Sequence, residues 1–242
     1  MIMSDEHKYV FVELPWTGST AISRELREHY GGRGVLHKHC NYREFLKYAS
    51  AEQRRYYVFS GIRNPLDALV SLYVKLVTDH RRNYSRNKDW VRRRDIRQYR
   101  WIQENKPSFA EFFLRFYHLP YENWSSLDHH RFDYVYRLEN VQDDFAEILR
   151  RIGLSQVRPL PVVHPTTGKG PSWQEHYGPE TRKRALFVCG PLMERWGYEF
   201  PEEWGVGRVQ LTARSLYKTI ALGKNAARRL RPTDHHAPDR LP

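Results

Sequence analysis

The chain contains few cysteines and no long apolar run, and both shortages exclude whole classes of protein. Cys40 and Cys189 are the two cysteines among 242 residues. They are too few for a disulfide framework, and they lack the paired spacing of zinc ribbons and fingers. No window approaches the roughly 20 apolar residues of a membrane span, and the stretch MIMSDEHKYVFVEL has no secretion-signal pattern. We therefore expect a soluble, cytoplasmic protein that holds no metal.

Negative charge is also scarce. The 28 Asp and Glu residues face 40 Lys and Arg residues, which leaves a formal charge of +12. This excess favours anionic partners, such as nucleotides, nucleic acid, acidic glycans or a lipid surface, without choosing among them. With 40% hydrophobic residues the chain can still form a core. We expect a single α/β domain over residues 1–207, followed by a basic helix and tail over residues 208–242.

Two strand-turn-helix units follow one another in the first part of the chain. Residues 9–14 predict a buried strand and residues 19–30 a helix. RRYYVFSGI and LDALVSLYVKLV repeat this order. In the second helix the apolar positions expected on one face are Leu66, Leu69, Val70, Tyr73 and Val77. The repetition predicts an α/β fold with a parallel β-sheet flanked by helices.

Later segments extend the pattern. FDYVYRLEN predicts a third strand, and PSFAEFFLRFY and VQDDFAEILRRIGL predict helices. GPETRKRALFVCGPLMERWGY predicts a last packed helix with a break near Gly190 and Pro191. The basic segment 80–106 is expected to be a mobile insertion or a solvated helical arm. Residues 208–231 predict a solvated helix, with an interfacial helix on anionic lipid as the alternative.

The turn PWTGST, between the first strand and its helix, favours an anion. A strand that leads into a helix at the edge of a sheet presents free N–H groups and the positive end of the helix dipole. Gly18 permits close backbone approach, and Thr17, Ser19 and Thr20 offer hydroxyl groups. The turn lacks the spacing and the lysine of GxxxxGK[ST], which argues against an ordinary ATP or GTP hydrolase. An ordinary turn with Ser19 or Thr20 as helix cap is the alternative.

The second turn, in SGIRNPLDALVSLY, offers two further phosphate ligands. Arg63 leaves the end of a strand, and Ser71 lies about two helical turns into the following helix. An arginine provides a planar fork for phosphate, and a serine provides a hydroxyl donor. A surface pair between Arg63 and Asp67 is the alternative.

Together, LPWTGSTAISRELREHY and FSGIRNPLDALVSLY resemble the two nucleotide-binding elements of the sulfotransferases that use 3′-phosphoadenosine 5′-phosphosulfate (PAPS). The match is closer to the carbohydrate-type, family 2 branch. YRLENVQDDFAEILRRIGL is similar to that branch's strand-then-helix element, and ERWGYEF to its usual ending. The resemblance runs from Tyr9 to Phe200. It implies a P-loop-like sulfotransferase fold and a PAPS-dependent enzyme.

The resemblance also implies three groups of cofactor-binding residues. The first loop would hold the 5′-phosphosulfate, the second element the 3′-phosphate, and a late Lys-Gly step in TTGKGPSW would add a third contact. A simple surface turn is the alternative for that last segment. The residues implied are Trp16, Thr17, Gly18, Ser19 and Thr20, then Arg63 and Ser71, then Lys169 and Gly170.

Sulfonyl transfer to an alcohol needs a base for the hydroxyl proton, and histidine suits this task because its pKa lies near neutrality. His39, in GVLHKHCNYREF, stands where some glycan sulfotransferases of this type carry their base. His37 is the neighbouring competitor.

Trp16 departs from the resemblance, because this family's loop commonly carries a lysine or arginine there. An indole cannot neutralise a leaving phosphate. Three explanations are open. A cation from another segment reaches the site, Trp16 shapes the acceptor site, or the protein binds nucleotide without fast turnover. We favour the first explanation. Its candidates are Lys38, Lys169 and Arg33, and Lys38 leads because it directly precedes His39.

The expected reaction moves a sulfonyl group from PAPS to a hydroxyl of a carbohydrate, glycolipid or secondary metabolite, releasing 3′-phosphoadenosine 5′-phosphate (PAP). A small-molecule kinase is a second hypothesis, disfavoured because no lysine follows the glycine turn. The third hypothesis is a PAP-binding protein, or a basic nucleic-acid or membrane-surface binding protein, that has lost activity; the clusters RRRDIRQYR and AARRLR motivate it. An anionic membrane surface is the partner expected for the carboxyl-terminal segment, and nucleic acid is not expected.

Overall fold

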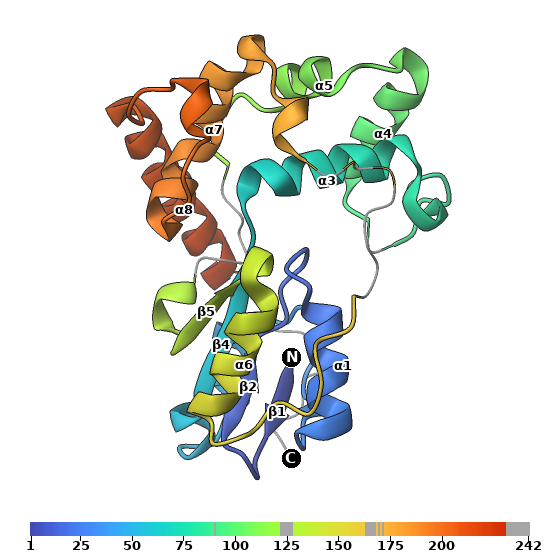
Figure 1. Cartoon of the computed structure of the whole chain (residues 1–242). Coiled ribbons are helices and arrows are strands. Elements are labelled where there is room, and N and C mark those ends of the chain that lie inside the picture. Colours follow the sequence, from blue (N-terminus) through green and yellow to red (C-terminus); the bar gives the residue numbers. More distant parts are fainter. Residues whose placement is uncertain (90, 122–127, 163–167, 169, 171, 231–242) are drawn as a thin grey trace. The chain divides into compact units, whose positions relative to one another are not determined.

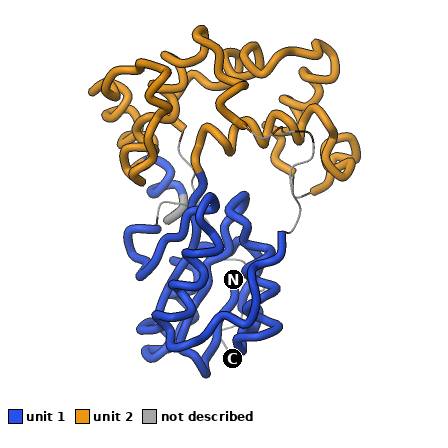
Figure 2. Tube along the Cα trace, in the orientation of Figure 1, with its two compact units in different colours: residues 1–63, 123–164, 223–242 blue, residues 64–122, 165–222 orange. Residues whose placement is uncertain are grey.

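The computed structural model describes residues 1–242 except 90, 122–127, 163–167, 169, 171 and 231–242. The described residues form a five-stranded sheet and eight α-helices (Figure 1). The chain divides into two compact units (Figure 2): unit 1 comprises residues 1–63, 123–164 and 223–242, and unit 2 comprises residues 64–122 and 165–222. The α/β fold class is confirmed, whereas the boundary expected between residues 207 and 208 stays a prediction.

The sheet lies in unit 1 and has the strand order β3-β1-β2-β4-β5. β2 (Tyr9–Phe11), β4 (Tyr57–Ile62) and β5 (Tyr134–Arg137) are parallel. β1 (Ile2–Ser4) and β3 (Arg33–Gly34) are antiparallel to their neighbours. The predicted parallel pairing is thus correct for the three predicted strands, and the sheet also contains two short antiparallel strands that the sequence analysis did not predict.

Helices cover both faces of the sheet in unit 1. Side chains alternate along each strand, so Phe11 and its neighbour Val10 enter separate clusters. The Phe11 cluster includes buried residues of α1 (Ser19–His29) and α6 (Val141–Arg151). The Val10 cluster includes those of α2 (Tyr42–Tyr48). This packing fixes where α1 begins relative to the end of β2.

Unit 2 is helical where the structure describes it. α3 contacts α4, α5 and α7, and α5 also contacts α7. Short 3-10 helices also occur along the chain. The α-helices of unit 2 are α3 (Pro65–Val77), α4 (Arg93–Asn105), α5 (Phe109–Phe116) and α7 (Pro179–Trp196), and α8 (Leu211–Leu230) begins in unit 2 and ends in unit 1. The 3-10 helices are Gln53–Arg55, His80–Arg82, His129–Arg131, Leu138–Asn140, Gln174–His176 and Glu202–Trp204. Across the described ranges, no helix is both long and apolar enough to cross a membrane.

Two expectations about unit 2 are corrected. The described part of segment 80–106 is not simply mobile or solvated, because α4 buries Ile96 and Ile102. These isoleucines lack the three-to-four spacing of an amphipathic stripe, so the sequence pattern did not reveal them. The predicted break in the last packed helix is also wrong, since α7 continues through Pro191. A Cβ atom at Gly190 would lie 2.6 Å from Val209, so glycine admits close packing there.

Candidate functional site

Three connections leave the sheet of unit 1 at the same edge. β2 pairs with β4, and β4 with β5, all in parallel register. Their carboxyl ends therefore meet, and this is the edge at which open α/β sheets bind ligands. The turn 15–18 follows β2, Arg63 follows β4, and Leu138 follows β5.

Gly18 is required at the start of α1 for two separate reasons. Its φ of 73° lies in the left-handed region, which side chains disfavour. A Cβ atom there would also lie 2.8 Å from the side chain of Leu138. Among the residues that the structure describes, no side chain caps the amino terminus of α1. The N–H of Ala21 donates to the carbonyl oxygen of Gly18 at 3.0 Å, so the N–H groups of Ser19 and Thr20 are the ones available to an anion.

The hydroxyls of Thr17 and Ser19 hold the turn in shape. Both side chains are buried, and both donate to the carbonyl oxygen of Leu14, at 3.0 Å and 2.8 Å. Their protons are thus engaged within the turn rather than directed at a ligand. Backbone N–H groups are the donors that this turn presents.

Tyr136 in β5 stabilises the turn through a hydrogen bond, and the sequence analysis did not identify this residue. Its hydroxyl donates to the carbonyl oxygen of Thr17 at 2.9 Å. Its ring occupies the space that a Cβ atom at Gly61 would need. Burial raises the pKa of Tyr136, so the phenol keeps its proton and remains a donor. The alternating pattern of YVYR indicated that one of its side chains faces inward, but it did not indicate that Tyr136 contacts Thr17.

Lys38 brings a cation to the glycine turn. Its Nζ donates to the hydroxyl of Thr20 at 3.3 Å. Of the other cations considered, Arg33 pairs with Asp5 at 2.6 Å, and Lys169 lies outside the described residues. The geometry therefore favours Lys38 as the cation that accompanies the turn.

His39 is held with one ring nitrogen committed. Its Nδ1 lies 3.1 Å from the carbonyl oxygen of Glu13. A carbonyl oxygen can only accept, so Nδ1 carries the hydrogen, and in the neutral ring Nε2 keeps a lone pair. Burial lowers the pKa of His39, and the charge of Lys38 lowers it further, against the hydrogen bond to Glu13. His39 is therefore neutral at physiological pH and suited to accept a proton at Nε2.

Glu13 is the charged residue beneath this loop that sequence reasoning missed. It is 3% exposed, lies 2.6 Å from the Met1 ammonium, and accepts a hydrogen bond from Ser23. Burial would raise the pKa of Glu13, but these contacts and the charge of Lys38 hold it below its usual value. The sequence did contain a signal for this residue, because Glu13 is a carboxylate inside the apolar run YVFVEL. A buried charged residue is rarely left unpaired, so the run indicated a nearby partner.

A cavity of about 410 Å³ lies beside Lys38. α1 and the loop after β3 contribute to its lining. Its two lining arginines, Arg24 and Arg27, have no carboxylate partner among the described residues, whereas Glu28 in the lining is paired with Arg158. The cavity therefore combines room for a ligand with an excess of positive charge.

A model described as the sulfotransferase family matches residues 1–184. The chain belongs to the sulfotransferase family. This confirms the resemblance to family 2 carried by the two nucleotide-binding elements. No curated protein and no solved structure matches the chain.

The remaining residues implied for this sulfotransferase keep their roles as predictions. Arg63 is half-buried directly after β4 in unit 1, and Ser71 is fully buried in α3 of unit 2. Gly170 is exposed with a φ of 76°. Trp16 is half-buried and also has a φ of 76°, which is strained for a bulky side chain.

Proposed function

We propose that this sulfotransferase moves the sulfonyl group of PAPS to a hydroxyl of a carbohydrate, glycolipid or secondary metabolite. The observation that carries the proposal is the placement of Lys38 against Thr20, with His39 as the next residue. A chain of this family that has Trp16 in the loop needs a cation from another segment, and Lys38 supplies it. The glycine turn and the uncapped start of α1 then complete an anion site.

In the proposed reaction, Nε2 of His39 takes the hydroxyl proton of the acceptor. The acceptor oxygen forms a bond to sulfur, and the bond between sulfur and the bridging phosphate oxygen breaks. PAP leaves with the electron pair of that bond. Lys38 and the N–H groups at the start of α1 stabilise the negative charge that develops on the phosphate.

Other residues serve binding in this proposal. Thr17, Gly18, Ser19 and Thr20 form the loop for the 5′-phosphosulfate, with Trp16 at its rim. From the family resemblance the proposal also assigns the 3′-phosphate to Arg63 and Ser71, and a late nucleotide contact to Lys169 and Gly170. The cavity of about 410 Å³ beside Lys38 is large enough for a sugar-sized group of the acceptor. No metal takes part in this step.

The direct test is incubation of the purified chain with PAPS and a panel of hydroxyl acceptors, followed by measurement of PAP release. A thermal shift with PAP measures nucleotide binding separately. We expect a rise in melting temperature with PAP and acceptor-dependent PAP release. Stabilisation by MgATP but not by PAP would instead support the kinase hypothesis, and PAP binding without turnover would support the inactive nucleotide-binding protein.

A second candidate function concerns α8 and an anionic membrane surface. Leu211 and Leu222 are 75% and 70% exposed on a helix that also carries Arg214, Lys218 and Lys224. Exposed leucines beside cations are typical of helices that lie at a lipid interface. Sedimentation with vesicles that contain phosphatidylserine, but not with neutral vesicles, is the expected result. Equal binding to both would count against it.

A further inference from the structure

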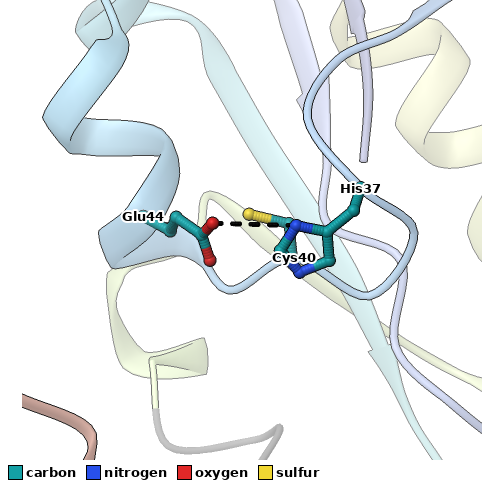
Figure 3. Close-up of side chains that lie close together, drawn as sticks. All are labelled: His37, Cys40 and Glu44. Atoms are coloured by element: carbon teal, nitrogen blue, oxygen red, sulfur yellow. Dashed lines mark ion pairs between the residues drawn. The ribbon is translucent and has the colours of Figure 1, made fainter. Parts of the chain in front are cut away.

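His37, Cys40 and Glu44 bring three different kinds of metal ligand to one place (Figure 3). One ligand atom of each residue lies within 4.8 Å of those of the other two. His37 and Cys40 belong to the loop after β3, and Glu44 belongs to the first turn of α2. The sequence did not suggest this site, because it contains no cysteine pair.

The spacing of the cluster suits a tetrahedral ion. Nδ1 of His37 lies 3.6 Å from Oε1 of Glu44. Zinc binds nitrogen and oxygen at about 2.0–2.2 Å, so two tetrahedral ligands of this kind lie about 3.3–3.6 Å apart. This pair of ligands is therefore nearly at the required separation. The sulfur lies within 4.8 Å of both atoms, and a tetrahedral site needs about 3.6 Å, so a side-chain adjustment of at most about 1.2 Å brings it into range.

We propose that His37, Cys40 and Glu44 form a zinc site. A thiolate and an imidazole favour Zn²⁺ over the hard ions Mg²⁺ and Ca²⁺. The thiolate of Cys40 and the carboxylate of Glu44 together balance the two positive charges of the ion. The side chain of His37 is 54% exposed, so the fourth position opens to water. Three protein ligands with one open position is a recurrent zinc geometry.

Binding of the ion releases one proton. Cys40 is fully buried, and its thiol donates weakly to the carbonyl oxygen of Asn41 at 3.4 Å. When zinc binds, the sulfur–hydrogen bond is exchanged for a sulfur–zinc bond and the proton goes to solvent.

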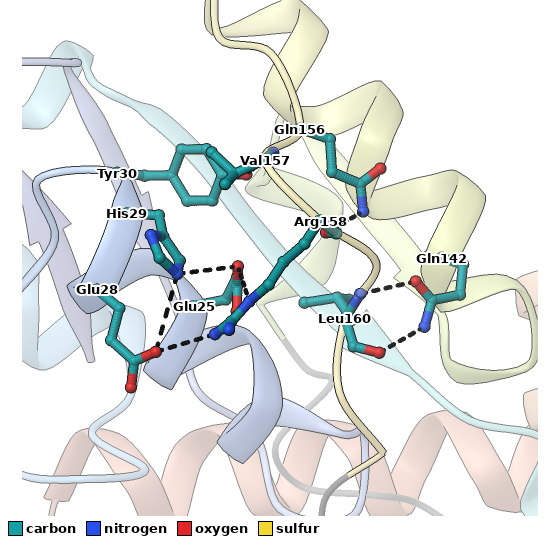
Figure 4. A network of polar contacts seen from close by, with 9 residues as sticks. All are labelled: Glu25, Glu28, His29, Tyr30, Gln142, Gln156, Val157, Arg158 and Leu160. Atoms are coloured by element: carbon teal, nitrogen blue, oxygen red, sulfur yellow. Dashed lines mark hydrogen bonds and ion pairs between the residues drawn. The ribbon is translucent and has the colours of Figure 1, made fainter.

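A second cluster with similar ligand types shows why the first one is different. Glu25, Glu28 and His29 also lie together, but Arg158 already places a cation between the two carboxylates (Figure 4). Its Nη2 lies 3.0 Å from an oxygen of each glutamate. That guanidinium neutralises the site and fastens the segment after α6 to α1. Near His37, Cys40 and Glu44 no described arginine or lysine pairs with the glutamate.

The position of the zinc site gives it a functional consequence, which rests on the proposed function. Lys38 and His39 lie between the ligands His37 and Cys40 in the chain. A bound ion would fix both ends of the segment that carries the proposed cation and base. Zinc would then act as a positioning element rather than as a participant in sulfonyl transfer.

The test uses the full chain, stripped of metal with a chelator and titrated with Co²⁺ as a spectroscopic probe. A cobalt–thiolate bond produces an intense near-ultraviolet charge-transfer band, which reports sulfur ligation directly. We expect the band to saturate at one Co²⁺ per chain and to disappear on addition of Zn²⁺. No band, or a band that persists under excess Zn²⁺, overturns the proposal.

Variants separate this site from others. Cys40→Ser is expected to abolish the band, and Cys189→Ser, which alters the other buried cysteine, to leave it unchanged. His37→Ala alters an exposed residue, so it should fold normally while weakening Co²⁺ binding at least about tenfold. His29→Ala is the matched control in the arginine-filled cluster. Wild-type Co²⁺ affinity in His37→Ala, or loss of the band in Cys189→Ser, would refute the assignment. These results do not depend on sulfotransferase activity, so they are separable from a failure of the proposed function.

Discussion

Replacement of Lys38 by methionine tests the proposed site most sharply. Methionine keeps most of the length of the unbranched side chain and removes its charge. Lys38 is exposed and contacts Thr20 through a single hydrogen bond, so the substitution should leave the fold intact. The predicted effect is therefore on transfer and not on stability.

The magnitude follows from the distance between charges. A cation about 5 Å from the developing phosphate charge contributes about 3 kcal/mol at an effective dielectric constant of about 20. Because Lys38 is exposed, solvent reduces this figure, and we take about 2–3 kcal/mol. Since about 1.4 kcal/mol corresponds to a tenfold change in rate, kcat/KM should fall roughly 30- to 150-fold.

The same variant should shift the pH profile. Burial lowers the pKa of His39 first, and Lys38 lowers it further. The base must be neutral, so activity is lost as pH falls through the pKa of His39. Removing the charge of Lys38 raises that pKa, and the acid limb of kcat/KM therefore moves to higher pH. A purely structural role of Lys38 would not move this limb.

The assay is PAP release at varied PAPS concentration and pH. Lys47→Met, on the exposed side of α2, is the matched control, and Lys38→Arg should restore part of the activity. A Lys38→Met enzyme with wild-type kcat/KM and an unshifted acid limb would refute the role assigned to this cation. The presence of Trp16 in place of the usual loop cation would then need an explanation that does not involve Lys38.

Three further outcomes are expected. His39→Gln should lower kcat by about 10²- to 10⁴-fold with PAP affinity retained by thermal shift, and the wild-type acid limb should lie below the ordinary histidine pKa of about 6.5. Equal activity of the variant would exclude His39 as the base. Gly61→Ala should lower the free energy of unfolding by about 1–3 kcal/mol in urea, because its Cβ overlaps the ring of Tyr136; an unchanged midpoint would contradict this packing. Arg158→Met removes the cation from the fully buried Glu25 and should lower the urea midpoint, whereas an unchanged midpoint would mean that His29, 3.6 Å from Glu25, is a sufficient partner.

Local patterns predicted the main elements well where periodicity was strong. The helix expected over residues 19–30 corresponds to α1, and LDALVSLYVKLV corresponds to α3. Within α3, however, Val77 is 43% exposed although its position predicted a buried face. The last turn of a helix extends beyond its packing partners more readily than its centre does, and the sequence pattern does not register this.

The candidate site was predicted only in part. The sequence placed an anion-binding turn at Gly18 and named Lys38 as the leading cation. It also expected the hydroxyls of Thr17 and Ser19 to serve the ligand, whereas both donate to Leu14. A hydroxyl in a turn can point inward or outward at similar cost, and the choice depends on which carbonyl groups lie nearby.

Neighbouring residues determine the order of strand, glycine turn and helix, which is why the sequence alone was enough to predict the family and the fold class. The contacts that shape the site join residues far apart in sequence. Lys38 reaches Thr20 across 18 positions, and Tyr136 reaches Thr17 across 119. These pairs form because β5 lies beside β4 and the loop after β3 returns to α1. Strand order results from packing of the whole sheet, so only the tertiary structure could reveal the hydrogen bond from Tyr136 to the turn and show that Lys38, one of three candidate cations, contacts Thr20.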